Sequence, residues 1–158
     1  MLFLAPQHYI KLTDAGRMIL DNKNLFIGKH IYNSIYGYSK GQMHRMMSGE
    51  CNGYQCEKRR KLYEKFGFDA KAASHLIRIL RQGLELLQTG ETNVLRPDAE
   101  ELLAIKRGEW SKDRIEAEAN KLFKASAEAV AASKLPEGPD IDKINELAVN
   151  VSVMLRFG

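Results

Sequence analysis

Residues 66–81 read Phe66-Gly67-Phe68-Asp69-Ala70-Lys71-Ala72-Ala73-Ser74-His75-Leu76-Ile77-Arg78-Ile79-Leu80-Arg81 and predict an amphipathic helix. Asp69 can accept hydrogen bonds from the free N–H groups of a helix start. Gly90 suits the left-handed residue that follows many helices, so we expect this helix to run to about Gln88. Apolar residues recur along it at helical spacing: Ala73, Leu76, Ile77, Leu80, Leu84 and Leu87. This stripe is predicted to lie in the core of the protein.

A second face of the same helix is polar and basic. Steps of four, three and four residues from Lys71 reach His75, Arg78 and Gln82, which share one side of a helix. A row of hydrogen-bond donors beside a buried face can hold an anion, although a solvated face with a structural histidine has the same pattern. An opposite wall can come from the preceding helix, expected over residues 29–47: Lys29, Tyr38, Lys40, Gln42 and Arg45.

The composition is that of one globular domain: 158 residues, 44% hydrophobic and 28% charged. No apolar run approaches the roughly 20 residues that span a bilayer, and the start lacks the basic region of a signal peptide. We therefore expect a cytoplasmic protein without membrane contact. Residues 1–82 carry 14 Lys/Arg and 6 Asp/Glu, net +8, whereas residues 83–158 carry 10 and 14, net −4. A basic first half suggests a nucleotide, a nucleic acid or an acidic protein as partner, or only a solvated face.

The chain is predicted to be mainly α: a compact bundle of about six helices with a short N-terminal β strand or hairpin. We expect one domain, 1–158, with the β element in 1–12 (Leu2–Leu4 and Tyr9–Leu12, broken at Pro6) and helices in 13–158. The expected helices cover 13–20, 29–47, 57–65, 69–88, 97–106, 111–133 and the segment from Asp140, whose stripe is Ile141, Ile144, Leu147, Ala148 and Val151. Gly37 and Gly41 inside a helix cost about 1 kcal/mol each relative to Ala, which indicates either close approach of a backbone or ligand, or loose packing.

Two patterns could hold a metal ion, and both have simpler explanations. Cys51 and Cys56 have C-x4-C spacing with His44 upstream, but structural zinc sites need four ligands, so free thiols are favoured. Asp140 and Asp142 have the spacing of a two-metal site, but they precede a predicted helix, where capping accounts for them. We therefore assign no metal ligand and no cofactor to the chain.

Other known chemical motifs are missing from the sequence. It has no Walker A loop, no Gly-x-Gly-x-x-Gly and no Gly-x-Ser-x-Gly. The basic run Lys58–Lys61 could contact phosphates without sequence preference, or form a solvated helix face. No residue is assigned a catalytic role.

The pattern Phe68-Asp69-x-Lys71-x-Ala73-x-His75-Leu76-x-Arg78-x-Leu80-x-x-Gly83-x-Glu85-x-Leu87-x-x-Gly90-Glu91 resembles the C-terminal half of predicted nucleotidyltransferases of the DNA polymerase beta superfamily, a group linked to RNA repair and common in bacteria and phages. The similarity continues through Arg96-Pro97-Asp98-Ala99 to Gly108-Glu109-Trp110. It extends backward through Gly37-Tyr38-x-x-x-Gln42-x-x-Arg45 and Leu25-Phe26-Ile27-x-Lys29 to Met1-Leu2-Phe3, so it covers about residues 1–150.

The resemblance implies a role on the substrate side and no catalytic residue. In that superfamily, a Gly-Ser turn and an Asp-x-Asp pair hold the triphosphate and two metal ions, and this sequence has no Gly-Ser dipeptide and no such pair before Met1. The chain resembles the helical companion of such an enzyme without its metal-binding half, so Mg²⁺ is expected only with a catalytic partner. Contacts to nucleotide or phosphate are implied for the positions that match: Lys29, Tyr38, Gln42, Arg45, Lys71, His75 and Arg78.

Three hypotheses follow. The first is a non-catalytic helical domain that binds nucleotide or RNA/DNA phosphates, as a split subunit beside a separate catalytic one. The second is a phage or mobile-element interaction module that inhibits a host enzyme through its basic face. The third is an active nucleotidyltransferase with an unrecognised site, which transfer from labelled nucleotides would reveal.

Overall fold

The computed structural model describes residues 2–4, 6–48 and 56–157, which form seven α-helices and two 3₁₀ turns. The α-helices are α1 (Asp14–Asp21), α2 (Ile31–Ser48), α3 (Cys56–Phe66), α4 (Ala70–Thr89), α5 (Ala99–Lys106), α6 (Lys112–Ala132) and α7 (Ile141–Phe157), and the turns are η1 (Pro6–His8) and η2 (Lys23–Phe26). The predicted mainly helical bundle is confirmed. None of these helices is long and apolar enough to cross a bilayer.

The predicted N-terminal strand or hairpin is wrong for the residues that the structure describes. Leu2–Leu4 lie in a turn and a bend, Pro6–His8 form η1, and Tyr9–Leu12 have no regular structure. A strand needs a partner with a ladder of hydrogen bonds. Here Phe3 makes a single backbone contact of that kind, accepting from the N–H of Thr92 at 3.4 Å.

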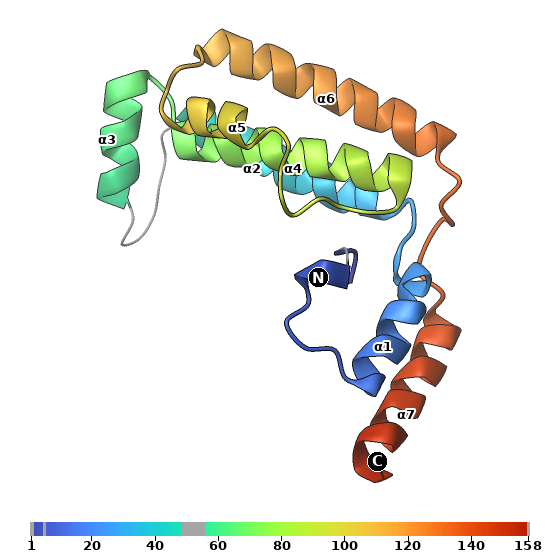
Figure 1. Ribbon diagram of the computed structural model, residues 1–158. Coiled ribbons are helices and arrows are strands. Elements are labelled where there is room, and N and C mark those ends of the chain that lie inside the picture. The colour runs from blue at the N-terminus through green and yellow to red at the C-terminus, as the bar shows by residue number, and fades with distance from the viewer. Residues whose placement is uncertain (1, 5, 49–55, 158) are drawn as a thin grey trace.

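Helix α4 is the centre of the body of the protein, packed against α2, α3, α5 and α6 (Figure 1). Its predicted apolar stripe is buried, except that Leu84 is only partly covered at the edge of the core. Large buried side chains around it include Met46, Phe68, Ile105, Trp110 and Phe123. The helix with the clearest signal in the sequence, α4, is therefore also the helix on which α2, α3, α5 and α6 pack.

Both predicted ends of α4 are confirmed. The Asp69 carboxylate accepts hydrogen bonds from the N–H groups of Lys71 and Ala72, both at 3.0 Å. Gly90 follows the helix with φ of 75°, where a residue without Cβ avoids a steric penalty. These local signals fix where α4 begins and ends, and the burial of its apolar stripe determines which side carries the basic row.

A cluster of ion pairs holds α4 to α5 and α6. The Arg81 guanidinium donates to Asp98 at 2.8 Å, Glu101 at 2.5 Å and Glu118 at 2.9 Å, and Arg96 also donates to Asp98, at 2.8 Å. Desolvation opposes the charge of Arg81, but its three carboxylate partners outweigh it and raise its pKa. Desolvation likewise opposes ionisation of Asp98, yet the hydrogen bonds from Arg96 and Arg81 lower its pKa.

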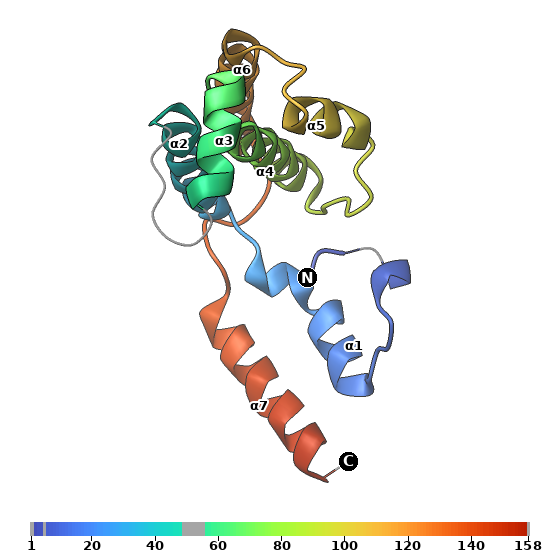
Figure 2. The same cartoon turned by 90° about the vertical axis from the view of Figure 1, so that its left-hand side faces the viewer.

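Helices α1 and α7 lie side by side and form an arm that projects from the body (Figures 1 and 2). The covered residues of α7 are Ile144, Leu147, Val151 and Met154. Ile141 and Ala148, which the sequence placed in the same core stripe, are exposed. The predicted cap of this helix is confirmed, since the Asp140 carboxylate accepts from the Lys143 N–H at 3.2 Å.

Two segments connect the arm to the body and run against each other. Their backbone hydrogen bonds join the N–H of Lys29 to the carbonyl of Pro136 at 2.7 Å, His30 to Glu137 at 3.2 Å and Asp140 to Leu25 at 2.9 Å. The approach is so close that a Cβ added to Gly28 would lie 2.9 Å from the Cα of Gly138. We call residues 25–30 and 136–140 the neck.

Candidate anion-binding cavity

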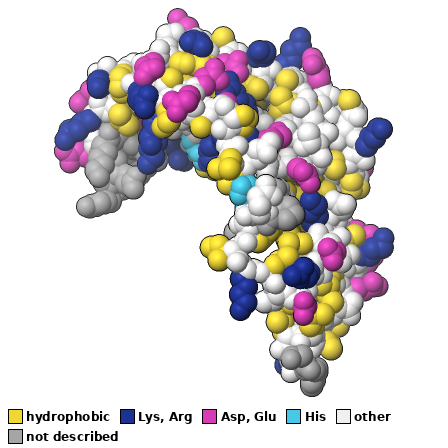
Figure 3. All heavy atoms as spheres, viewed as in Figure 1, with side chains coloured by type: hydrophobic (Ala, Val, Ile, Leu, Met, Phe, Trp, Pro, Cys, Tyr) yellow, Lys and Arg dark blue, Asp and Glu magenta, His cyan; other side chains and the backbone are white. Residues whose placement is uncertain are grey.

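A cavity of about 340 Å³ lies between α2 and α4, where the sequence predicted a binding site. Its lining residues are Tyr38, Gln42 and Arg45 from α2, Lys71, Ala72, Ser74, His75 and Arg78 from α4, and Lys106 from the end of α5. Six of the seven residues that the resemblance implied therefore meet around one space. In Figure 3, Lys and Arg side chains gather with a histidine along the concave lower side of the body.

The positive charges of the cavity have no carboxylate partner within the described part of the chain. Arg45, Lys71, Arg78 and Lys106 form no ion pair with any of the described residues. Arg81, on the same helix, has three carboxylate partners. Cations that share one cavity repel each other, and an anionic ligand would relieve that repulsion.

His75 connects the two walls. Its Nδ1 lies 2.8 Å from Nη2 of Arg78, and its Nε2 lies 2.9 Å from the hydroxyl of Tyr38. Arginine can only donate, so Nδ1 is the acceptor and the ring proton of the neutral form is on Nε2, donating to Tyr38. Partial burial, followed by the charges of Arg78, Arg45 and Lys71, lowers the pKa of His75, which favours this neutral form.

This arrangement leaves the Tyr38 hydroxyl hydrogen free. The hydroxyl oxygen accepts from His75, so its own hydrogen can be donated to a ligand. The Tyr38 side chain is half exposed, at 50%, and lines the cavity. The walls thus present guanidinium, ammonium and hydroxyl donors to the space between them.

Gln42 adds a buried amide. The residue is 4% exposed, lines the cavity, and forms no hydrogen bond with its side chain to any residue that the structure describes. Its amide oxygen and nitrogen are not among the fully buried side-chain atoms without a partner, so solvent or a ligand in the cavity can reach them. Gln42 can both donate and accept, so it can bind an anion or a neutral polar group.

Lys29 is the one implied residue that lies elsewhere. Its ammonium pairs with Glu137 at 2.8 Å in the neck, because residue 29 precedes the first turn of α2. Two further residues of the predicted walls also lie outside the cavity lining. Lys40 stacks its ammonium over the Phe123 ring, 4.5 Å from the centroid, and Gln82 accepts a hydrogen bond from Arg78 at 3.3 Å.

Sequence reasoning missed Ser74 and Lys106. Ser74 lies three residues after Lys71 and four before Arg78, so helical spacing alone could have included it. Its hydroxyl donates to the carbonyl of Leu102 at 2.9 Å and ties α4 to α5. Lys106 reaches the cavity through that packing of α5 on α4, which no local signal reveals.

The remaining motifs add no second site within the residues that the structure describes. Cys51 lies outside the described residues, and no group of three His, Cys, Asp or Glu that could hold a metal ion occurs within them. In the basic run, Arg60 pairs with Glu64 at 3.3 Å and Lys61 with Glu57 at 3.0 Å. Two of the four cations of that run are thus paired with glutamates of the same helix.

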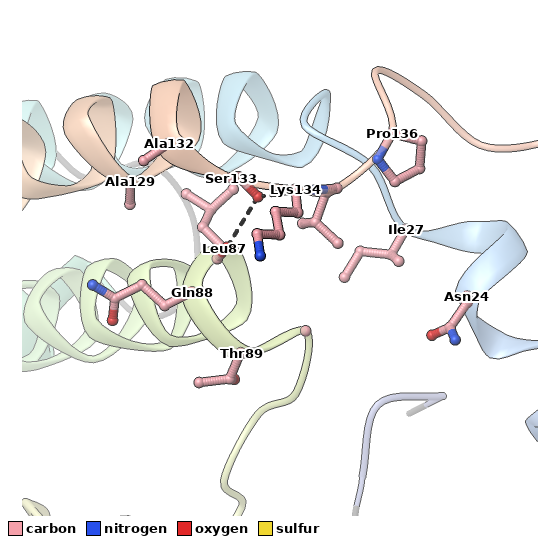
Figure 4. Close-up of a pocket in the computed structure, with 12 residues that line it drawn as sticks. Asn24, Ile27, Leu87, Gln88, Thr89, Ala129, Ala132, Ser133, Lys134 and Pro136 are labelled. Carbon is pink, nitrogen blue, oxygen red and sulfur yellow. Dashed lines mark hydrogen bonds between the residues drawn. The ribbon is translucent and has the colours of Figure 1, made fainter.

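A larger cavity of about 730 Å³ lies where the C-terminal ends of α4 and α6 meet the neck (Figure 4). Leu87, Ala129 and Pro136 line it, and the Ser133 hydroxyl donates to the Leu87 carbonyl across it at 3.1 Å. Lys134 is its one charged lining residue. None of the binding residues predicted from sequence lines this cavity.

Fold and cavity together define an all-helical protein, over its described residues, with a cationic cavity between two helices. No family model, no curated protein and no solved structure matches the chain. The similarity to nucleotidyltransferases thus rests on the sequence positions quoted above.

Proposed function

We propose that this protein binds the phosphate groups of a nucleotide or nucleic acid in the cavity between α2 and α4. The observation that carries the proposal is the set of four cations around one cavity that have no carboxylate partner among the residues the structure describes. The Lys ammonium contacts phosphate oxygens as a point charge, and the planar Arg guanidinium can donate two parallel hydrogen bonds to them. The Tyr38 hydroxyl, oriented by His75, supplies a further donor to the same oxygens.

Cations on both walls of the cavity suit a phosphate group of a nucleotide or of a nucleic-acid backbone. The cavity has room for a phosphate group together with part of a sugar or base. Arg45 and Tyr38 lie on one wall and Lys71 and Arg78 on the other, so a single phosphate can contact both helices. Binding would depend strongly on salt, since it releases counterions from the phosphates.

The resemblance favours the same class of ligand. Six positions that match the nucleotidyltransferase pattern line the cavity. In this proposal the chain holds the substrate, and a separate catalytic subunit supplies the metal-binding carboxylates and Mg²⁺. The coding sequence upstream tests that arrangement, because a Gly-Ser and Asp-x-Asp domain should be encoded there.

Isothermal titration with nucleoside triphosphates and short RNA at low salt tests the binding itself. Lys71→Ala and Arg78→Ala should each weaken binding by roughly tenfold, as expected for a charge-assisted hydrogen bond of about 1.5 kcal/mol. Lys29→Ala is the matched control, since it removes a cation that pairs with Glu137 outside the cavity. No heat from the wild type, or equal affinities for all three variants, would refute the proposal.

A protein ligand is the second candidate, because the half-exposed Tyr38 lies beside Arg45 and Arg78 in the same cavity. Tyr and Arg are enriched in the energetic centres of protein interfaces. A partner with an acidic loop would be captured by the wild type and lost with Tyr38→Ala. This hypothesis differs from the first in predicting no affinity for free nucleotides.

A further inference from the structure

Helix α7 has an outward apolar face that no other described element covers. Four of the ten large hydrophobic side chains exposed among the described residues belong to this helix: Ile141, Val149, Val153 and Leu155. Val149 is 62% and Leu155 70% exposed. The covered side of α7 packs on α1 and η2, so these residues lie beyond that contact. Such a concentration of apolar side chains on one element indicates an interaction surface.

The outward face contains two rows with seven-residue spacing, about 100° apart around the helix. Residues seven apart lie almost above one another on a helix. Ile141, Ala148 and Leu155 form the first row, and Asp142, Val149 and Arg156 form the second. The exposed Asn145 and Ser152 lie between the rows, and Val153 lies beside the second. Large apolar side chains stand at both ends of the first row. The second row has a negative charge at one end and a positive charge at the other. Neither Asp142 nor Arg156 has an ion-pair partner among the described residues.

We propose that a second copy of this chain covers the face, with the two α7 helices antiparallel about a twofold axis near Val149. In such an isologous contact, Asp142 of one copy faces Arg156 of the other, and the reverse pair forms by symmetry. Ile141 then packs near Leu155, and the small Ala148 next to the axis permits close approach of the helices. A parallel pairing would set Asp142 against Asp142, and like charges disfavour it.

The dimer is expected to be weak. A helix of 17 residues is about 25 Å long. One pair of such helices buries less than the roughly 1,600 Å² of a standard interface, which places it among the transient ones. The cavity between α2 and α4 is not part of this contact, so the inference does not depend on the proposed function.

Sedimentation velocity over a series of protein concentrations tests the inference. The wild type should shift from monomer to dimer as concentration rises. Val149→Glu, which places two like charges at the axis, and the single reversals Asp142→Arg and Arg156→Asp should stay monomeric. The double variant D142R/R156D should recover the dimer, because each pair is restored with its charges exchanged. Asn150→Glu, at an exposed position on another side of α7, should dimerise as the wild type does.

Circular dichroism of each variant separates a lost interface from a lost helix. Val149 is exposed, so Val149→Glu should keep its helical signal even where the charge reversals at the helix ends reduce theirs. A wild type that stays monomeric at every concentration would overturn the inference. A folded Val149→Glu variant that dimerises as strongly as the wild type would overturn it as well, as would a folded double variant that remains monomeric.

Discussion

The Nη2 atom of Arg78 lies 2.8 Å from Nδ1 of His75, so a permanently charged guanidinium donates to a neutral imidazole. That contact fixes the tautomer of His75 and directs its Nε2–H to Tyr38. The three side chains form a chain of hydrogen bonds, here called the relay, that runs from Arg78 on α4 to Tyr38 on α2. The Tyr38 hydroxyl hydrogen, at the end of this chain, remains available to a ligand. The cavity is therefore organised before any ligand arrives, and this organisation can be tested one residue at a time.

His75 should make stability depend on pH. Its pKa is lowered in the folded protein, so the unfolded chain binds the proton more readily. The free energy of unfolding should thus decrease as pH falls from about 6.5 towards the lowered folded value, and it should lose nothing further below both. His75→Gln should remove this part of the pH dependence, whereas the exposed His30→Gln should retain it. Urea unfolding at pH 8 and pH 5 measures both, and identical pH dependences of wild type and His75→Gln would contradict the relay.

Tyr38→Phe should weaken ligand binding without weakening the fold. It removes one hydroxyl whose net hydrogen-bond contribution is about 1 kcal/mol, which corresponds to roughly fivefold in affinity. The side chain is half exposed, so the melting temperature should change little. Titration with the same triphosphate measures the change. An unaltered affinity would show that the hydroxyl hydrogen does not reach the ligand.

Arg81→Met should destabilise the protein by roughly 2–3 kcal/mol, because it leaves the partly buried Asp98 and Glu118 without their shared cation. Arg107→Met is the control, since Arg107 lies 4.0 Å from an exposed Glu109 and should change stability by less than about 0.5 kcal/mol. Denaturant midpoints compare the two. Equal effects would show that the Arg81 cluster contributes no more than a surface pair.

Gly28→Ala should disrupt the neck. The new Cβ would meet backbone atoms of Pro136 and Gly138 at 2.9 Å, and backbone cannot move aside as a side chain can. We expect a loss of about 1–3 kcal/mol, as for other overpacked sites. Hydrogen exchange should rise in α1 and α7 more than in α4, because the neck joins the arm to the body. Uniform exchange across all helices would contradict this separation.

Gly41→Ala is the control for Gly28→Ala, because it adds the same methyl group at a helix position with free space around it. A Cβ at Gly41 meets nothing within 4 Å, and the same holds for Gly37. Both glycines are exposed to solvent, and no described part of the protein approaches them closely. Gly41→Ala should stabilise the protein by roughly 0.5–1 kcal/mol, since alanine favours a helix more than glycine does. A loss of stability would indicate a contact that the structure does not contain.

The sequence predicted what depends on spacing within one helix. Asp69 and Gly90 mark the ends of α4 through backbone chemistry, and the Lys71–His75–Arg78 row follows from helical geometry alone. Tyr38, Gln42 and Arg45 share a face of α2 for the same reason, so one correct pairing of two helices brought six residues together.

The errors arise where the result depends on contacts between distant segments. Lys29 binds Glu137 because two remote segments meet in the neck, and Lys106 reaches the cavity because α5 packs on α4. In α7, periodicity predicted one stripe that included Ile141 and Ala148, but the packing on α1 and η2 leaves these two residues exposed. The N-terminal strand failed similarly, since an apolar run becomes a strand only where a partner strand is available.

The most direct test of the cationic cavity is to map where a phosphate ligand binds. Amide chemical shifts should be followed by NMR during a titration with a nucleoside triphosphate at low salt. The account predicts concentration-dependent shifts confined to residues 38–45, 71–78 and the vicinity of Lys106, which disappear in the Lys71→Ala/Arg78→Ala double variant. Absent shifts, or shifts centred on Ser133 and Lys134 or on α3, would contradict it.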